Sequence, residues 1–208
     1  MTYKPQNCRQ YYPTFILIAI NIAVYAYTSL LSGNAVYTSD TVISTYGQVN
    51  EFVFSGYYWQ LFTSLFIHVN IVHLGGNMLV LFVFGLRGED LFTLPEYLTV
   101  YFLSGACGNI LTLYLGSLFF GPGLVSAGAS GAIFGMLGAV TVYIRRRIGQ
   151  SIISALLFAF LLLILSTGPD VNWLAHLGGL GAGILIGYLL AIANRPKTSY
   201  QHSVTYPA

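Results

Sequence analysis

Six long apolar stretches follow one another along the chain, and each has about the length that a helix needs to cross a membrane. They cover residues 15–31, 73–88, 95–117, 129–145, 148–166 and 172–194. A transmembrane helix takes about 20 predominantly apolar residues. The apolar positions are continuous rather than alternating, which argues against a β-barrel. The pattern therefore predicts an all-α polytopic membrane protein, a six-helix transmembrane bundle in which residues 1–208 form a single domain.

The connections between these stretches differ in character. Residues 32–72 form an expected external loop whose second half, from Phe52 to Phe66, is crowded with aromatic residues. Aromatic rings favour the boundary between lipid and water, so we expect an interfacial element there. It serves either as an anchor alone or also as the edge of a lateral entrance. Residues 118–128 form a second external loop, and residues 195–208 a flexible cytoplasmic tail.

Basic residues give the bundle a direction. They precede the first stretch at Lys4 and Arg9, and they lie at or directly after the ends of the second, fourth and sixth stretches, at Arg87, at Arg145, Arg146 and Arg147, and at Arg195 and Lys197. With six spans, all of these positions fall on one side, and basic loops remain in the cytoplasm. Both termini are therefore expected to be cytoplasmic. A lipid-binding or nucleic-acid role for the three successive arginines is the weaker interpretation, because arginines commonly end a span.

Composition agrees with a membrane protein and narrows its partners. Only 7% of the 208 residues are charged, against about 25% in a soluble domain. The net charge of +2 is too small to indicate a nucleic-acid partner. Cys8 precedes the first span and Cys107 lies inside the third, so we expect no disulfide and no metal site from them. We also expect no cofactor. The N-terminus lacks a signal-peptide pattern, so the first span is expected to be a permanent anchor.

Polar side chains inside the apolar stretches are candidates for function, because their burial in lipid is costly. Ser130 lies in the sequence Gly-Ala-Ser-Gly at residues 128–131, at the start of a predicted helix, where negative charge is stabilised. His73 and Asn77 share one helix face, and His176 opens the last span. Counting from the cytoplasmic arginines, Ser130 and His73 lie at roughly 22 and 21 Å and His176 at roughly 28 Å, a difference that helix tilt can absorb.

This set of side chains suits hydrolysis. A serine needs a base to take its proton, which a neutral imidazole can do. The side chains of His73 and Asn77, with the backbone N–H of Ser130, are suitable donors to an oxyanion. Taken alone, the sequence around Ser130 is better explained by close helix packing, and an interhelical hydrogen bond explains each histidine at least as well as catalysis does. Their common depth favours catalysis.

Glycines predict that two of the spans approach closely. One row continues the helix face of His176 and a second row surrounds Ser130: Gly179, Gly183 and Gly187, and Gly131, Gly135 and Gly138. Glycine-lined helices come close enough for a serine on one to bond a histidine on the other. Phe134, one turn after Ser130, is expected to hold the imidazole ring by aromatic contact.

The order and spacing of these motifs resemble the rhomboid family of intramembrane serine proteases. The likeness runs from about Trp59 to Gly187 and rests on Trp59-Gln60-Leu61-Phe62-Thr63, His68, His73, Asn77-Met78, Tyr101-Phe102-Leu103-Ser104-Gly105, Gly128-Ala129-Ser130-Gly131, Ala175-His176 and Gly179. The resemblance implies that Ser130 is the nucleophile and His176 the general base. It assigns His73 and Asn77 to the oxyanion site.

The resemblance also implies supporting roles and a substrate. His68 matches a histidine that supports the external loop, and Gly128 and Gly131 flank the nucleophile. Two positions depart from the family pattern: Phe134 stands where tyrosine is frequent and Gln60 where arginine is common. The family resemblance implies cleavage of single-pass transmembrane proteins near the outer membrane face, often after a small residue. We expect the setting to be a prokaryotic cell membrane.

Two other functions remain open at this stage. A non-catalytic relative would bind and escort membrane helices, but it would be expected to lack the serine or its histidine. A small transporter would use midplane histidines, but internal repeats typical of that class are not visible. Asp170, six residues before His176, is read as a loop residue and stays an alternative for orienting that imidazole.

Overall fold

The computed structural model describes residues 12–151, 153–165 and 171–194. Six long helices lie in this part of the chain, over the six apolar stretches: α1 (Pro13–Ser32), α5 (Ile71–Leu91), α6 (Leu94–Phe120), α7 (Ser130–Arg147), α8 (Ile153–Leu165) and α9 (Trp173–Ala193). Among the described residues, α1, α5, α6 and α9 are long and apolar enough to cross a membrane. α7 has 18 residues and ends in three arginines.

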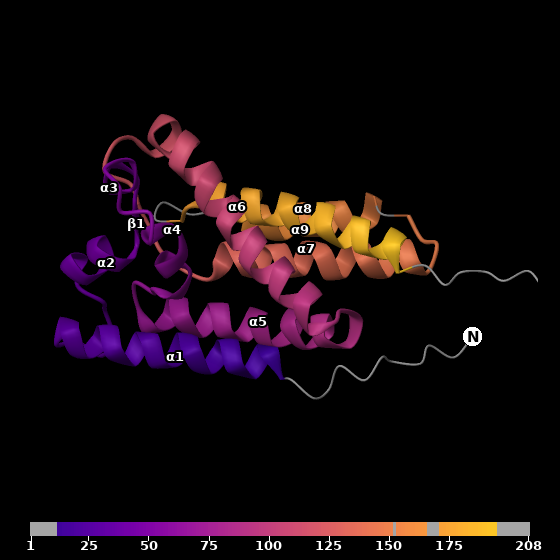
Figure 1. The fold of residues 1–208 in the computed structure, drawn as a ribbon, viewed down its shortest axis with the longest axis horizontal. Coiled ribbons are helices and arrows are strands. Elements are labelled where there is room, and N and C mark those ends of the chain that lie inside the picture. The colour runs from indigo at the N-terminus through magenta and orange to yellow at the C-terminus, as the bar shows by residue number, and fades with distance from the viewer. Residues whose placement is uncertain (1–11, 152, 166–170, 195–208) are drawn as a thin grey trace, which may run out of the picture.

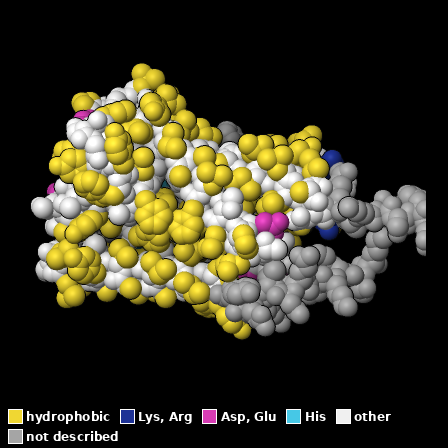
Figure 2. All heavy atoms as spheres, in the orientation of Figure 1, with side chains coloured by type: hydrophobic (Ala, Val, Ile, Leu, Met, Phe, Trp, Pro, Cys, Tyr) yellow, Lys and Arg dark blue, Asp and Glu magenta, His cyan; other side chains and the backbone are white. Residues whose placement is uncertain are grey.

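α7 is the central helix, in contact with α5, α6, α8 and α9 (Figure 1). Its buried side chains, among them Met136 and Val140, form one core with Tyr97 and Tyr101 of α6. Hydrophobic side chains also cover much of the outer surface in Figure 2. An apolar exterior suits lipid, because the helices of a membrane bundle face hydrocarbon on the outside.

Local signals set the ends of α6. The hydroxyl and backbone N–H of Thr93 both donate to the Glu96 carboxylate, at 2.9 and 2.8 Å, in a capping box. At the other end Gly121 has a φ of 81°, which favours glycine and stops the helix. The helix therefore continues to Phe120 and includes three residues that the sequence assigns to the loop 118–128.

The expected loop 32–72 is folded into short elements at one end of the bundle (Figure 1). They are α2 (Asp40–Tyr46), β1 (Gln48–Val49), α3 (Asn50–Phe54), α4 (Gln60–Thr63) and the 3-10 helix η1 (Ser64–Phe66). β1 pairs antiparallel with β2 (Val125–Ser126), which joins this region to the segment before α7. Trp59 and Phe62 remain about half exposed, as suits an interfacial element.

Gln60 holds this region together from the inside. Its side chain is fully buried, and its amide nitrogen donates to the carbonyls of Ser44 and Thr45 at 2.8 and 3.2 Å. Its amide oxygen accepts from the backbone N–H of Val49 at 2.9 Å. One side chain thus connects α2 to β1.

Candidate active site

Ser130 is the first residue of α7, and a glycine with a positive φ precedes it by two residues. Gly128 has a φ of +131°, and a Cβ built there would lie 2.8 Å from Cε1 of His73. The backbone N–H of Gly128 donates to the carbonyl of Ser64 at 2.9 Å, which ties this turn to η1. At the first position of a helix, Ser130 lies beside backbone N–H groups that have no partner within the helix. Glycine at 128 is thus required both by conformation and by space.

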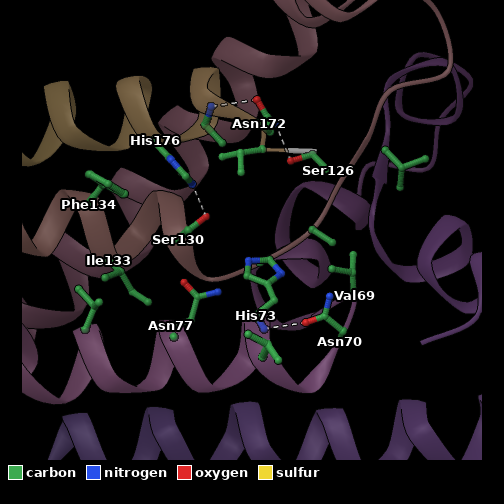
Figure 3. A pocket seen from close by; sticks show the side chains of 18 of the residues that line it. Val69, Asn70, His73, Asn77, Ser126, Ser130, Ile133, Phe134, Asn172 and His176 are labelled. Carbon is green, nitrogen blue, oxygen red and sulfur yellow. Dashed lines mark hydrogen bonds between the residues drawn. The ribbon is translucent and has the colours of Figure 1, made fainter. Parts of the chain in front are cut away.

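His176 lies in the first turn of α9 and contacts Ser130 directly. Its Nε2 is 2.8 Å from Oγ of Ser130, as Figure 3 shows. The imidazole is only 6% exposed. The ring of Phe134 stacks on it, with centroids 4.6 Å apart and planes at 19°. Contact with Phe134 on one side and Ser130 on the other fixes the ring's orientation.

Glycines bring the two helices together. A Cβ at Gly179 would overlap the carbonyl of Gly131, and one at Gly183 would overlap the carbonyl of Gly135. Gly187 faces Ala139 in the same way one turn further along. The matching spacing of four residues on both helices allows backbone contact over three successive turns. The distance between Ser130 and His176 follows from this contact.

α5 supplies two more polar side chains from the opposite wall. His73 and Asn77 face the turn before Ser130, and Asn77 points toward the serine in Figure 3. Asn70 caps the start of this helix, and its side-chain oxygen accepts from the backbone N–H of His73 at 2.8 Å. Within the described part of the chain, the buried Nδ2 of Asn77 has no hydrogen-bond acceptor. A buried donor of this kind is available to a ligand that enters the site.

A cavity of about 590 Å³ opens among these groups, with Ser130, His176, His73 and Asn77 in its wall. The rest of the lining is mostly apolar and comes from several elements, including Val36, Val69, Val72, Val80, Val125, Ile133 and Val171. A pocket of this kind binds apolar side chains and uses its few polar groups to fix orientation.

His68 lies behind this site rather than in it. It is fully buried, and its ring meets the ring of His73 edge-on at 5.2 Å. Its carbonyl accepts from the hydroxyl of Thr38 at 2.7 Å, and its Nδ1 lies 3.3 Å from the carbonyl of Phe66. Burial lowers the pKa of His68 to about 3, so the ring is neutral at physiological pH. His68 thus connects the folded loop to the back of His73.

The carboxylates and cysteines of the described chain lie elsewhere. Among the described residues, no Asp or Glu lines the cavity, and no cluster of His, Cys, Asp or Glu is suited to a metal ion. Cys107 is a half-buried free thiol in α6. Cys8 and Asp170 lie outside the described residues.

Two asparagines of the site were not predicted from the sequence. Asn70 and Asn172 each cap a helix that carries a site histidine, and both line the cavity. Asn172 accepts from the N–H of Ala175 at 3.2 Å. An asparagine directly before an apolar stretch is an N-cap signal, so both were accessible from the sequence.

Comparison with known proteins relates this chain to a single family. The Rhomboid domain family matches residues 55–193. A Bacillus subtilis protein named Putative rhomboid protease YdcA is 34% identical over 183 residues, which cover 85% of this chain and 86% of the relative. Rhomboid protease GluP of the same organism is 29% identical over 183 residues, covering 86% of this chain and 34% of GluP.

Plant proteins are similar over a shorter region. RHOMBOID-like protein 7 of Arabidopsis thaliana is 37% identical over 142 residues, which are 64% of this chain and 43% of the relative. RHOMBOID-like protein 1 is 34% identical over 150 residues, or 36% of its length. The chain thus spans less than half of these two relatives. Together with the apolar helices, the family match confirms what the motifs predicted: the chain is an integral, polytopic helical membrane protein that belongs to the rhomboid family.

Proposed function

We propose that this protein is an intramembrane serine endopeptidase in which Ser130 is the nucleophile and His176 the general base. The observation that carries the proposal is the 2.8 Å contact between Ser130 Oγ and His176 Nε2 at the wall of a cavity. A nucleophile and a base at hydrogen-bond distance are the minimum that covalent hydrolysis requires. Relatives named rhomboid proteases support protease activity.

The proposed reaction proceeds through an acyl-enzyme. Oγ of Ser130 attacks the scissile carbonyl while Nε2 of His176 accepts its proton. The C–N bond then breaks and the leaving amine takes that proton from His176. Water attacks the acyl-enzyme with His176 again as base, which restores the serine. Phe134 keeps the imidazole plane fixed during both transfers, since its ring stacks on that of His176.

We assign the oxyanion to donors on two helices. The backbone N–H of Ser130 lies at the helix N-terminus, where the helix dipole favours negative charge. Asn77 offers a buried Nδ2 that has no acceptor among the described residues. His73 lies beside Gly128 on the same wall, and we assign its ring N–H to the same oxygen. Loss of one such donor typically lowers kcat by about 10²–10³-fold.

The proposed substrates are single-pass transmembrane proteins, cleaved near the outer membrane face. The cavity is lined mainly by apolar side chains and lies among helices of a membrane protein, so a lipid-embedded segment is the natural occupant. An intact helix hides its carbonyls in internal hydrogen bonds, so the substrate must unwind locally before it reaches Ser130.

We further propose that both termini are cytoplasmic and that the setting is a prokaryotic cell membrane. Arg87 lies near the C-terminal end of α5, Arg145 to Arg147 end α7, and the C-terminal ends of these two helices lie at the same end of the bundle (Figure 1). The Arg147 guanidinium donates to the carbonyl of Asn194, directly after α9. Asn194 also donates to Glu96 of α6 at 3.0 Å. Basic ends on one side indicate the cytoplasm. The bacterial relative matched over 86% of its length supports a prokaryotic origin.

A cleavage assay tests the proposal. The purified protein is reconstituted in liposomes with a panel of tagged single-pass proteins, and products are identified by mass spectrometry. Wild-type protein is expected to cut at least one within or beside its membrane segment. Ser130→Ala and His176→Ala are expected to be inactive while eluting as the same monodisperse species. Normal cleavage by Ser130→Ala would end the serine protease assignment. Histidine-dependent solute flux that persists in Ser130→Ala would favour a transporter instead.

A further inference from the structure

The side chain of Asn172 connects three elements around the site. Its amide nitrogen donates to Oγ of Ser126 at 2.7 Å and to Oγ1 of Thr112 at 2.9 Å. Its amide oxygen accepts from the backbone N–H of Ala175 at 3.2 Å. Both amide hydrogens and the amide oxygen are therefore engaged with the protein. This pattern also fixes the amide orientation, since only the oxygen can accept from an N–H.

The two hydroxyl partners are themselves held rigidly. Ser126 is buried in β2, where it pairs with Gln48 of β1. Thr112 is fully buried in α6, and its hydroxyl donates to the carbonyl of Gly108 at 3.0 Å. A Cβ at Gly108 would overlap the carbonyl of Ala175, so α6 and the first turn of α9 are in backbone contact there. Asn172 thus joins the start of α9 to a fixed wall and to the strand that leads to α7.

The positions of these bonds in the sequence relate them to the proposed dyad. Asn172 precedes His176 by four residues, and Ser126 precedes Ser130 by the same number. Residues 126–130 and 172–176 are therefore joined at both ends, by the Asn172–Ser126 bond at one end and by the Ser130–His176 contact at the other (Figure 3). The glycine contacts at Gly179, Gly183 and Gly187 lie beyond the dyad along α9. The first turn of α9 packs against Gly108 and Gly131 through the backbone of Ala175, and Asn172 adds the polar bonds to Thr112 and Ser126.

We propose that Asn172 is a positioning residue: its amide holds the first turn of α9 in register with the strand before α7, so that Nε2 of His176 stays within hydrogen-bond distance of Ser130. The inference rests on the proposed function, because it assigns a role in the geometry of that dyad. Asn172 acts through Ser126 and Thr112 and transfers no proton. Displacements of about 1 Å at a reacting pair can lower rates by as much as 10²-fold, so a bond that prevents them matters.

The test measures how fast Ser130 reacts with a fluorophosphonate in detergent-solubilised full-length protein. Ser126→Ala and Thr112→Val each remove one acceptor and keep the side-chain volume, while Asn172→Ala removes all three bonds. We expect the labelling rate constant to fall roughly 10-fold in Asn172→Ala and less in the single-acceptor variants. The double variant Asn172→Ala/Ser126→Ala is expected to react no more slowly than Asn172→Ala, because both remove the same bond.

A matched control separates positioning from general stability. Thr14→Val removes an equally buried hydroxyl, which bonds Tyr97 at 2.9 Å at the other end of the bundle. The rate constant does not depend on how much protein is folded, whereas the final labelled fraction and Tm do. A lower labelling rate constant in Asn172→Ala, together with the same final labelled fraction as in Thr14→Val, supports the proposal.

Two results would count against it. A rate constant equal to wild type, whether or not Tm or the labelled fraction falls, would reduce Asn172 to a helix cap and overturn the proposal. If wild-type protein itself fails to label at Ser130, the proposed serine protease function falls first and this inference with it. The two failures are thereby distinguishable. If Asn172→Ala does not fold, the milder Ser126→Ala and Thr112→Val variants give the same decision.

Discussion

At the residue scale, the site depends on a few side chains whose neighbours leave them little freedom. Ser130 begins a helix directly after a glycine whose φ of +131° and contact with His73 exclude other residues. His176 is held by Phe134 and Ser130. Behind them, His68 is fully buried and its ring packs against that of His73. Ser130 and His176 thus owe part of their orientation to Gly128 and Phe134, which take no part in the proposed chemistry.

The burial of His68 predicts a pH dependence of stability. Burial lowers the pKa of His68 to about 3, whereas an unfolded histidine has a pKa of about 6.5. Below about pH 6.5 the unfolded chain therefore binds a proton that the folded protein does not. The contribution of His68 is present above that pH and is lost as the pH falls toward 3, at about 1.4 kcal/mol per pH unit.

Thermal unfolding in a non-ionic detergent at pH 7 and pH 5 checks this expectation. Wild-type protein should lose more Tm on acidification than His68→Gln, whose amide does not titrate. The change in Tm between pH 7 and pH 5 can be compared between the two proteins even if the substitution lowers Tm at both pH values. Identical pH dependence in the two proteins would show that His68 is not the group responsible.

At the scale of elements, the contact between α7 and α9 sets the geometry of the dyad. Glycines at matching positions allow the two backbones to touch over three turns. In lipid the hydrophobic effect does not hold helices together, so close packing of small residues takes its place. A side chain inserted in this contact is expected to separate Ser130 from His176 as well as to destabilise the bundle.

Two glycines of α9 provide a matched pair for this prediction. A Cβ at Gly183 would overlap the backbone of Gly135, whereas one at Gly181 meets nothing within 4 Å. Gly183→Ala should therefore cost about 1–3 kcal/mol of stability and most of the activity. Gly181→Ala should leave activity intact and be neutral or stabilising by up to about 1 kcal/mol. Tm and cleavage rate measure both, and equal behaviour of the two variants would contradict the packing account.

The sequence predicted the long elements well and the short ones poorly, for a physical reason. Long apolar runs and the spacing of His73 and Asn77 carry a periodic signal that survives without any tertiary context. The pairing of β1 with β2 joins two-residue strands that are far apart in the chain, and strands so short have no period to detect. The bonds of Gln60 and Asn172 are equally non-local. By contrast, the helix caps formed by Asn70 and Asn172 had a local signal in the sequence, because each asparagine directly precedes an apolar stretch.

At the scale of the whole molecule, the two ends of the bundle differ in chemistry. The folded region 32–72 and the strand before α7 cover one end, next to the candidate site (Figure 1). The arginines in the C-terminal turns of α5 and α7 lie at the other end, where Arg147 contacts Asn194. This polarity is the basis for the proposal that the site faces outward and that both termini are cytoplasmic.

Reporter fusions test that orientation. Green fluorescent protein fused after Ala208 is expected to fluoresce, and alkaline phosphatase fused there is expected to be inactive, because the first needs the cytoplasm and the second an oxidising exterior. Phosphatase inserted beside Gly123, between α6 and β2, should be active. The opposite pattern at the two positions would show that the bundle has the reverse orientation, with the site at the cytoplasmic face.

The central claim is that Ser130 is a nucleophile activated by His176, and its most direct measurement is mass spectrometry of the protein after reaction with a fluorophosphonate. Wild-type protein should carry one adduct on the peptide that contains Ser130. His176→Ala should remain unlabelled over the same time while showing the same elution and a similar Tm. Labelling of His176→Ala at the wild-type rate, or an adduct on another residue in place of Ser130, would contradict the account.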